Sequence, residues 1–203
     1  MMCRVERSGS CEAFLNTSPT RKRHTGKSRA GNMPEGSGVF GIENPEVGWA
    51  LSKFLAAYEH LETIMPKLLA LLLGGYDDVT AGYVFRAIRN PSTKRELLQS
   101  LLEKAPINSK VPHDIDEMLD EYKILTGQRN QLAHGKWFTH DTDGNPTFVS
   151  RFSEHGWDLI EASEISAEEI DTLANRATAL GVWIVTAVDP ILDERRKASQ
   201  SSG

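Results

Sequence analysis

A short stretch near position 130 carries side chains suited to phosphate chemistry: Arg129, Asn130 and His134. Arginine offers a fixed fork of hydrogen-bond donors to phosphate oxygens and keeps its charge. Histidine titrates near neutral pH, so it can take up or release a proton during a reaction. Asn130 and His134 are spaced i and i+4 on one helix face, so we expect Asn130 to orient the His134 ring. The trio predicts a site for a phosphate diester.

The same residues also have a purely structural interpretation. Arg129 would pair with a carboxylate or cap backbone carbonyls, and His134 would be a hydrogen-bonded residue at the end of a helix. Gly135 follows and is expected to end that helix. Spacing alone favours this interpretation, because short motifs often match by chance.

In its context the trio resembles the motif of the HEPN superfamily (higher eukaryotes and prokaryotes nucleotide-binding domain). That motif is an Arg, four to six residues and a His, often with a polar residue directly after the Arg. Arg129, Asn130 and His134 match it position by position, and the resemblance covers about residues 45 to 192.

The resemblance implies a metal-independent endoribonuclease in which an RNA 2′-hydroxyl attacks the adjacent phosphorus. A symmetric homodimer would bring two copies of His134 to one cleft. The implied partners are RNA or a nucleotide, a second copy of the chain, and an antitoxin or regulatory protein, because such proteins often act as toxins or in phage defence. No cofactor and no metal are expected. The alternative is a non-catalytic HEPN-like dimer that binds nucleotides or a partner protein.

Glu62 is a second unusual residue, because it places a carboxylate in an otherwise apolar row with Leu55 and Leu69. A buried carboxylate is costly unless a cation or hydrogen-bond donors meet it. We expect Arg129 to be that cation, with Glu62 holding it or assisting proton transfer, while the neighbouring Glu59 lies at the surface. If the helix rotates enough to leave Glu62 in water, this role disappears.

Apolar periodicity predicts five helices. Asn44 and Pro45 suit the start of the first, Pro66 should bend it, and Ser166 with Glu169 forms a capping box before the last. Arg129 falls within the apolar stripe of the fourth helix and so requires an acid, an interface or a bound phosphate. In that helix Gly127 is expected to permit close approach of another backbone. The expected helices span 45–72, 80–88, 93–104, 114–134 and 167–188.

Residues 137–139 and 147–149 are expected to pair as a β-hairpin. The fold expected is therefore all-α, a HEPN-like bundle of four to five helices with a small β-hairpin before the last helix. Asp189-Pro190 should end the last helix, leaving residues 193–203 flexible. The apolar residues Val182, Trp183 and Val185 widen that helix's apolar surface, and we expect a second subunit to cover them.

The first 43 residues are expected to be a disordered basic tail outside the helical domain, which would span residues 44–192. Residues 1–38 carry seven Lys or Arg and three Glu, which leaves 16 basic and 25 acidic residues for the rest of the chain. An acidic body argues against broad non-specific binding to nucleic acid. We hypothesise that translation begins at Met33, which peptides from upstream of Met33 would refute.

Cysteine usage and hydropathy favour a cytoplasmic location. Cys3 and Cys11 make neither a disulfide framework nor a zinc site, and no apolar run is long enough to cross a bilayer. His113 and Asp116 have the residue types of a metal pair, but further ligands are missing, so acidic residues at a helix start explain them better. A metal hydrolase using these two residues stays an alternative that chelation would test. His140 lies on the expected hairpin and could reach the cleft, although an exposed loop position is favoured.

Overall fold

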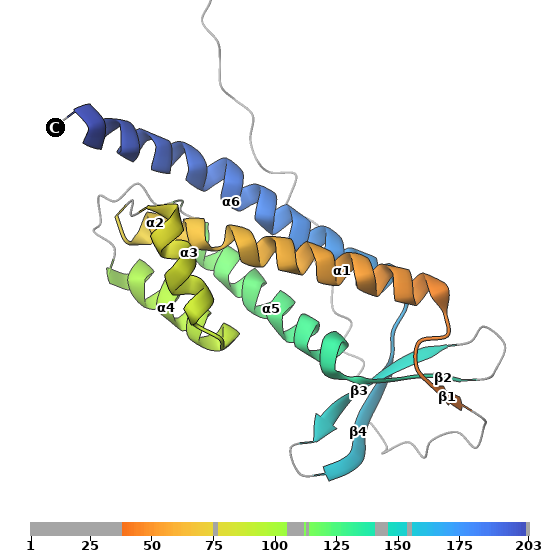
Figure 1. Cartoon of the computed structure of the whole chain (residues 1–203). Helices are drawn as coiled ribbons and strands as arrows, with labels where there is room; N and C mark the ends of the chain where they lie inside the picture. The colour runs from red at the N-terminus through yellow and green to blue at the C-terminus, as the bar shows by residue number, and fades with distance from the viewer. Residues whose placement is uncertain are drawn as a thin grey trace, which may run out of the picture. The chain divides into compact units, whose positions relative to one another are not determined.

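The computed structural model describes residues 38–74, 77–104, 112, 114–140, 146–153 and 156–201. The expected tail before residue 38 lies outside the described residues. Residues Glu35–Gly203 form one compact unit, and its described part is mainly helical (Figure 1). Of the helices described, none combines the length and the apolar character that a membrane span needs.

Six helices and four strands are present among the described residues. The helices are α1 (Pro45–Ile64), α2 (Pro66–Leu72), α3 (Asp78–Ala87), α4 (Pro91–Lys104), α5 (Ile115–His134) and α6 (Ala167–Ser201). The strands are β1 (Gly38–Phe40), β2 (Lys136–His140), β3 (Thr147–Ser153) and β4 (Gly156–Glu164).

The start of α1 follows from local sequence. The Asn44 side-chain oxygen accepts hydrogen bonds from the backbone N–H of Glu46 at 3.0 Å and of Val47 at 3.4 Å. Pro45 occupies the first turn, where its missing donor costs nothing. The expected bend at Pro66 is a break between α1 and α2, because proline cannot donate the hydrogen bond that would continue the helix.

The core forms where α1, α5 and α6 pack against one another. Lys53 of α1 pairs with Asp171, and Lys67 of α2 pairs with Asp189, each at 2.6 Å, so α1 and α2 in succession run parallel to α6 (Figure 1). α5 runs antiparallel to α1 and α6. The apolar stripe expected on the first helix supplies much of this core, and its buried members are Val47, Phe54, Tyr58, Leu61, Met65 and Leu68.

The last helix does not end at Asp189-Pro190, and that expectation was wrong. α6 continues through Pro190 to Ser201. Lys67 holds Asp189, and Nη1 of Arg195 donates to the Leu71 carbonyl at the end of α2 at 2.8 Å. Val188 and Leu192 are buried on either side of the proline. Packing against α2 therefore offsets the backbone hydrogen bond that Pro190 cannot make.

The expected hairpin is confirmed and is part of a larger sheet. Trp137 faces Val149 and Thr139 faces Thr147 in the β2–β3 pair. β1 pairs with β2, and β4 pairs with β3, giving an antiparallel sheet in the order β1-β2-β3-β4. β1 begins inside the segment expected to be a tail. The turn between β2 and β3 lies outside the described residues.

Candidate functional site

The C-terminal end of α5 is fixed against the sheet. Nε1 of Trp137 donates to the Leu132 carbonyl at 2.9 Å, which ties β2 back to the helix. Gly135 follows α5 in an extended conformation. A Cβ at this position would lie 2.5 Å from the Gln131 carbonyl oxygen and 2.5 Å from a methyl carbon of Val149. Gly135 is thus required by close packing against β3, and it orients the last turn that carries His134.

Arg129 is the centre of the candidate site. Its Nη1 lies 3.4 Å from Nε2 of His134 and donates to the Asn130 side-chain oxygen at 3.3 Å. Because a guanidinium only donates, the contact with His134 uses the lone pair of Nε2. Both distances are at the long end for hydrogen bonds, so the trio is loosely held. The structure therefore brings the three motif residues together.

The carboxylate beside Arg129 comes from Glu59. Nη2 of Arg129 lies 3.7 Å from Oε1 of Glu59, and the Arg129 Cζ lies 6.0 Å from the centroid of the Tyr58 ring. The expectation that Glu62 meets Arg129 was wrong, whereas Glu59 does lie at the surface as expected and is the acid that reaches Arg129. One turn of α1 separates the two acids, and the helix is oriented so that Glu59 faces the guanidinium.

Glu62 is instead bound by Lys94 and two tyrosines. The Lys94 ammonium and the Tyr122 hydroxyl contact its two carboxylate oxygens, and Tyr58 donates to it at 3.2 Å. The Glu62 side chain is 17% exposed and that of Lys94 is 12% exposed, so this is a largely buried ion pair. We call Tyr58, Glu62, Lys94 and Tyr122 the Glu62 cluster. It joins α1, α4 and α5.

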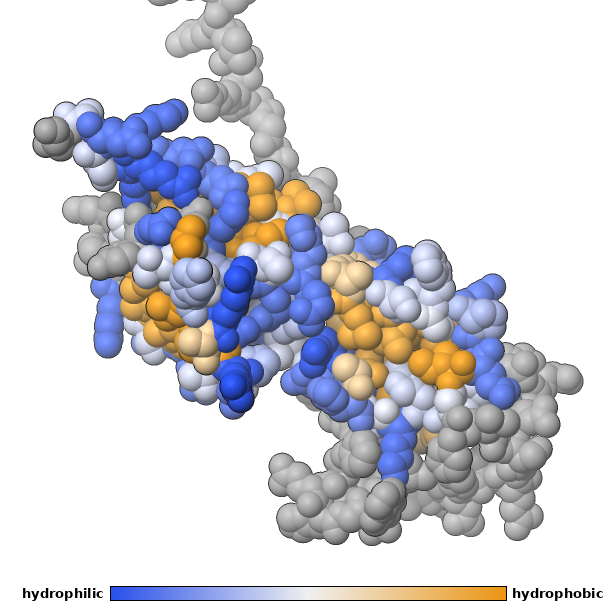
Figure 2. All heavy atoms as spheres, in the orientation of Figure 1, coloured by the Kyte–Doolittle hydropathy of each residue, from blue (hydrophilic) through white to orange (hydrophobic). Residues whose placement is uncertain are grey.

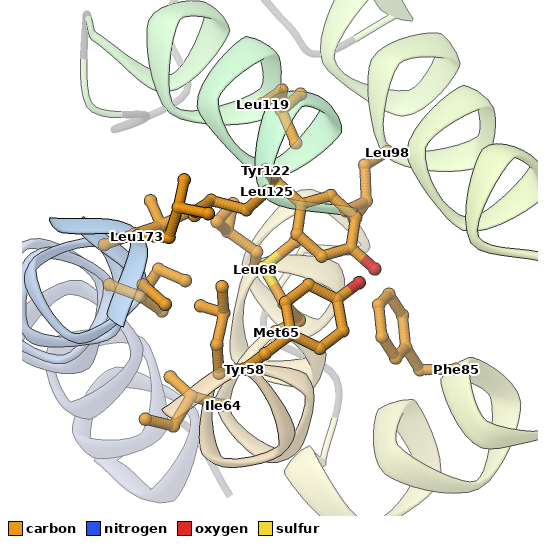
Figure 3. Close-up of a cluster of buried hydrophobic side chains, with 14 of the residues drawn as sticks. Tyr58, Ile64, Met65, Leu68, Phe85, Leu98, Leu119, Tyr122, Leu125 and Leu173 are labelled. Atoms are coloured by element: carbon orange, nitrogen blue, oxygen red, sulfur yellow. The ribbon is translucent and has the colours of Figure 1, made fainter. Parts of the chain in front are cut away.

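Both tyrosines of the Glu62 cluster stay protonated near neutral pH. Burial raises the pKa of Tyr58 to about 12 and raises the pKa of Tyr122 further above its ordinary value. Their rings lie parallel with centroids 6.4 Å apart, and the Tyr58 hydroxyl also lies 2.8 Å from Oγ1 of Thr126. Figure 3 shows the two hydroxyl groups pointing to the same side, toward Phe85 of α3. The Tyr58 ring under Arg129 is therefore anchored at its hydroxyl end.

The candidate site is open to solvent. The Arg129 side chain is 29% exposed and that of Glu59 is 69% exposed, while Asn130 and His134 are also exposed. Nε of Arg129 is buried and has no hydrogen-bond partner among the described residues. Asn130 interacts with Arg129 and not, as expected, with the His134 ring. The site can thus receive a ligand from solvent, with both terminal nitrogens of the guanidinium in contact with neighbouring side chains.

Other motifs give no metal centre in the part of the chain that the structure describes. These residues contain no group of three His, Cys, Asp or Glu side chains that could hold a metal ion. Asp116 accepts a hydrogen bond from Gln99 at 3.0 Å, while His113 lies outside the described residues. His140 lies in β2, and its side chain also falls outside the description. The described residues therefore give no structural support to the metal-hydrolase alternative.

Sequence reasoning missed Glu59, Tyr58 and Lys94. Tyr58 was assigned to the apolar stripe, where its ring does lie, but its contact with Arg129 depends on how α5 crosses α1. Lys94 lies 32 positions from Glu62, on α4. The available signal was the pair of acids one turn apart on one face of α1, which made either of them a candidate partner for Arg129.

Comparisons with protein-family models, curated proteins and solved structures found no match to this chain. The function of this chain is therefore inferred from the geometry around Arg129 and from the resemblance of its motif.

Proposed function

We propose that this protein is a metal-independent endoribonuclease, with Arg129 and His134 at its active site. The observation that carries the proposal is the 3.4 Å contact between Nη1 of Arg129 and Nε2 of His134, beside a carboxylate and open to solvent. Arginine beside histidine provides a phosphate-binding group next to a proton-transfer group. The resemblance of Arg129, Asn130 and His134 to the HEPN motif adds support from the sequence.

The reaction is an internal transesterification. The RNA 2′-oxygen forms a bond to the adjacent phosphorus, the bond from phosphorus to the 5′-oxygen breaks, and a 2′,3′-cyclic phosphate and a 5′-hydroxyl result. One group accepts the proton of the 2′-hydroxyl, and another donates a proton to the leaving 5′-oxygen. His134 performs one of these transfers. Arg129 stabilises the charge that develops on the non-bridging oxygens.

The remaining motif residues position Arg129. Asn130 accepts a hydrogen bond from its Nη1, and the Tyr58 ring lies beneath its guanidinium. Glu62 acts one step further away, because it fixes the hydroxyl of Tyr58. Glu62 is thus a positioning residue in this proposal and not a partner of Arg129.

The second proton-transfer group has two candidate sources. A homodimer would supply His134 of a second copy, as the resemblance implies, and the exposed Val182 and Val185 of α6 are available to such an interface. Glu59 is the other candidate, because it lies on the opposite nitrogen of the same guanidinium from His134. Specific activity that rises with protein concentration indicates the dimer, whereas constant specific activity down to a monomeric sample indicates Glu59.

A non-catalytic nucleotide-binding module is the second candidate function. The observation that favours it is the contact with Glu59, which already balances the charge of Arg129 and would make anion binding weak and reversible. A role as a toxin or in phage defence, with an antitoxin as partner, follows only from the motif resemblance and forms part of the first proposal.

The deciding experiment is cleavage of varied single-stranded RNAs in EDTA. Wild type should cleave, and His134→Ala of equal thermal stability should not. His60→Ala is the matched control, because His60 is an exposed histidine of α1 whose side chain makes no hydrogen bond or ion pair among the described residues. Equal inactivity of wild type and His134→Ala on all RNAs would favour the binding module, and loss of wild-type activity only on chelation would favour a metal hydrolase.

A further inference from the structure

The end of α3 carries an exposed aromatic side chain and two exposed arginines. Tyr83 is 70% exposed, and Arg86 lies one turn further along the same face. Arg89 follows in the connection to α4 and is also exposed. Within the described parts of the chain, neither arginine makes an ion pair or a side-chain hydrogen bond. Three side chains able to bind a ligand therefore face solvent here.

This end of α3 reaches the Glu62 cluster. The helix packs along α2, and its buried Phe85 lies under Lys94, whose Nζ is 4.5 Å from the ring centroid. Figure 3 shows the Phe85 ring beside the hydroxyl ends of Tyr58 and Tyr122. Arg86 and Arg89 follow Phe85 closely in the chain, so they lie at the end of α3 that contacts the Glu62 cluster through Phe85 and Lys94.

The Glu62 cluster connects this end of α3 with Arg129. Lys94 contacts Glu62, Glu62 accepts from Tyr58, and the Tyr58 ring lies 6.0 Å from the Arg129 Cζ. Figure 2 shows strongly hydrophilic surface between two apolar areas, over the region where α3 ends and α5 passes in Figure 1. One extended ligand could therefore contact both Arg129 and the exposed residues of α3.

Charge favours nucleic acid as the ligand. Outside the first 38 residues, acidic side chains outnumber basic ones by 25 to 16, so arginines without an acidic partner are unusual in this part of the chain. An arginine pair beside an exposed tyrosine combines phosphate binding with a stacking surface for a base. A protein ligand would use the apolar neighbours Val79 and Val84 but would not by itself explain the two arginines.

We propose that Tyr83, Arg86 and Arg89 bind the single-stranded RNA that flanks the phosphate held by Arg129. Tyr83 stacks on an unpaired base, and the two arginines contact the phosphates next to it. The choice of RNA rests on the proposed nuclease function. The binding itself does not require cleavage, so the two proposals can fail separately.

The test is fluorescence anisotropy with a single-stranded oligonucleotide of about 12 nucleotides, a length in the range that such surfaces bind. It carries 2′-O-methyl groups, so it lacks the attacking hydroxyl and stays intact. Arg86→Ala with Arg89→Ala should weaken binding about tenfold and lower the slope of log affinity against log salt by about 1.4. Tyr83→Ala should weaken binding by a similar factor, and Tyr83→Phe should not, because the ring is retained.

The matched control removes two exposed cations elsewhere, Lys104 at the end of α4 and Lys197 near the end of α6. If this double alanine variant binds as weakly as the arginine variant, only long-range charge matters and the proposal is overturned. Wild-type affinity in both the arginine and Tyr83→Ala variants overturns it too, and a protein partner then better explains the exposed α3 surface. Binding that depends on α3 without any cleavage of unmodified RNA keeps this proposal and removes the nuclease one.

Discussion

Arg129 and Glu59 lie with Nη2 and Oε1 3.7 Å apart, while Glu62, one turn further along α1, is bound by Lys94. The two acids therefore have different roles despite their proximity. Glu59 is exposed and weakly held, so a ligand can displace it. Glu62 is largely buried, so its loss would leave the largely buried Lys94 ammonium without a counter-charge.

Glu59→Gln should strengthen anion binding at Arg129. Removal of the carboxylate frees the guanidinium from its nearest counter-charge, and we expect affinity for a mononucleotide to rise by about threefold to tenfold at low salt. Stability should change by less than about 1 kcal/mol, because the pair is exposed. Isothermal titration with a nucleoside 3′-monophosphate measures the affinity. A weaker or unchanged affinity would show that Glu59 does not compete for this site.

Glu62→Gln should destabilise the fold much more than Glu59→Gln. It leaves the Lys94 ammonium largely buried without its carboxylate, which costs about 3 kcal/mol. Urea unfolding of the two variants side by side measures the difference. Equal stability of the two variants would mean that the Glu62–Lys94 pair is dispensable. A double variant in which Lys94→Met accompanies Glu62→Gln should recover part of the loss.

Tyr58 should make the folded protein lose stability in strong alkali. Its pKa is 10.0 in the unfolded chain and about 12 when folded, because the side chain is buried. The folded protein therefore keeps a proton that the unfolded chain releases. The corresponding stability is present below pH 10 and is lost between pH 10 and pH 12, by about 3 kcal/mol. Urea unfolding at pH 9 and pH 11.5 should show a smaller loss in Tyr58→Phe than in wild type, and an identical loss would contradict this account.

Substitution by alanine should have opposite effects on stability at Gly127, within α5, and at Gly135, directly after it. Gly135→Ala would force a Cβ into the Gln131 carbonyl oxygen and Val149, so we expect a loss of at least about 2 kcal/mol. A Cβ added at Gly127 would meet no atom of another element within 4 Å, which overturns the expectation of a close backbone neighbour there. Gly127→Ala should stabilise the exposed helix by up to about 1 kcal/mol. Thermal unfolding of both variants tests this, and a stabilising Gly135→Ala would contradict the packing at the end of α5.

The sequence correctly predicted those features that depend on residues within one helical turn of each other. Asn44 with Pro45, and Ser166 with Glu169, mark helix starts because the capping groups lie within one turn; the Ser166 backbone N–H does donate to the Glu169 carboxylate at 2.8 Å. The helix end predicted at Pro190 was wrong, because α6 accommodates this proline through contacts with α2, more than 100 positions earlier in the chain. β1 and β4 were missed for a related reason, since each is defined by pairing with another strand.

In the candidate site, too, a contact within one helix could be predicted and a contact between two helices could not. The contact between Arg129 and His134 could be predicted, because a long arginine side chain can reach a histidine five positions later at the end of the same helix. Which acid of α1 meets Arg129 depends on the rotation of one helix against another, and each residue step turns a helix by about 100°. An apolar stripe several residues wide does not define this angle closely enough. Tertiary packing of α1 against α5 therefore decides between Glu59 and Glu62.

The most direct test of the central claim is the chemistry of the RNA ends. Wild-type protein is incubated with single-stranded RNA in EDTA, and the product masses are measured by mass spectrometry, with His134→Ala as the control. We expect 2′,3′-cyclic phosphate and 5′-hydroxyl ends from wild type and intact RNA from His134→Ala. Products with 3′-hydroxyl and 5′-phosphate ends, or the same cyclic products from His134→Ala, would contradict a transesterification carried out by Arg129 and His134.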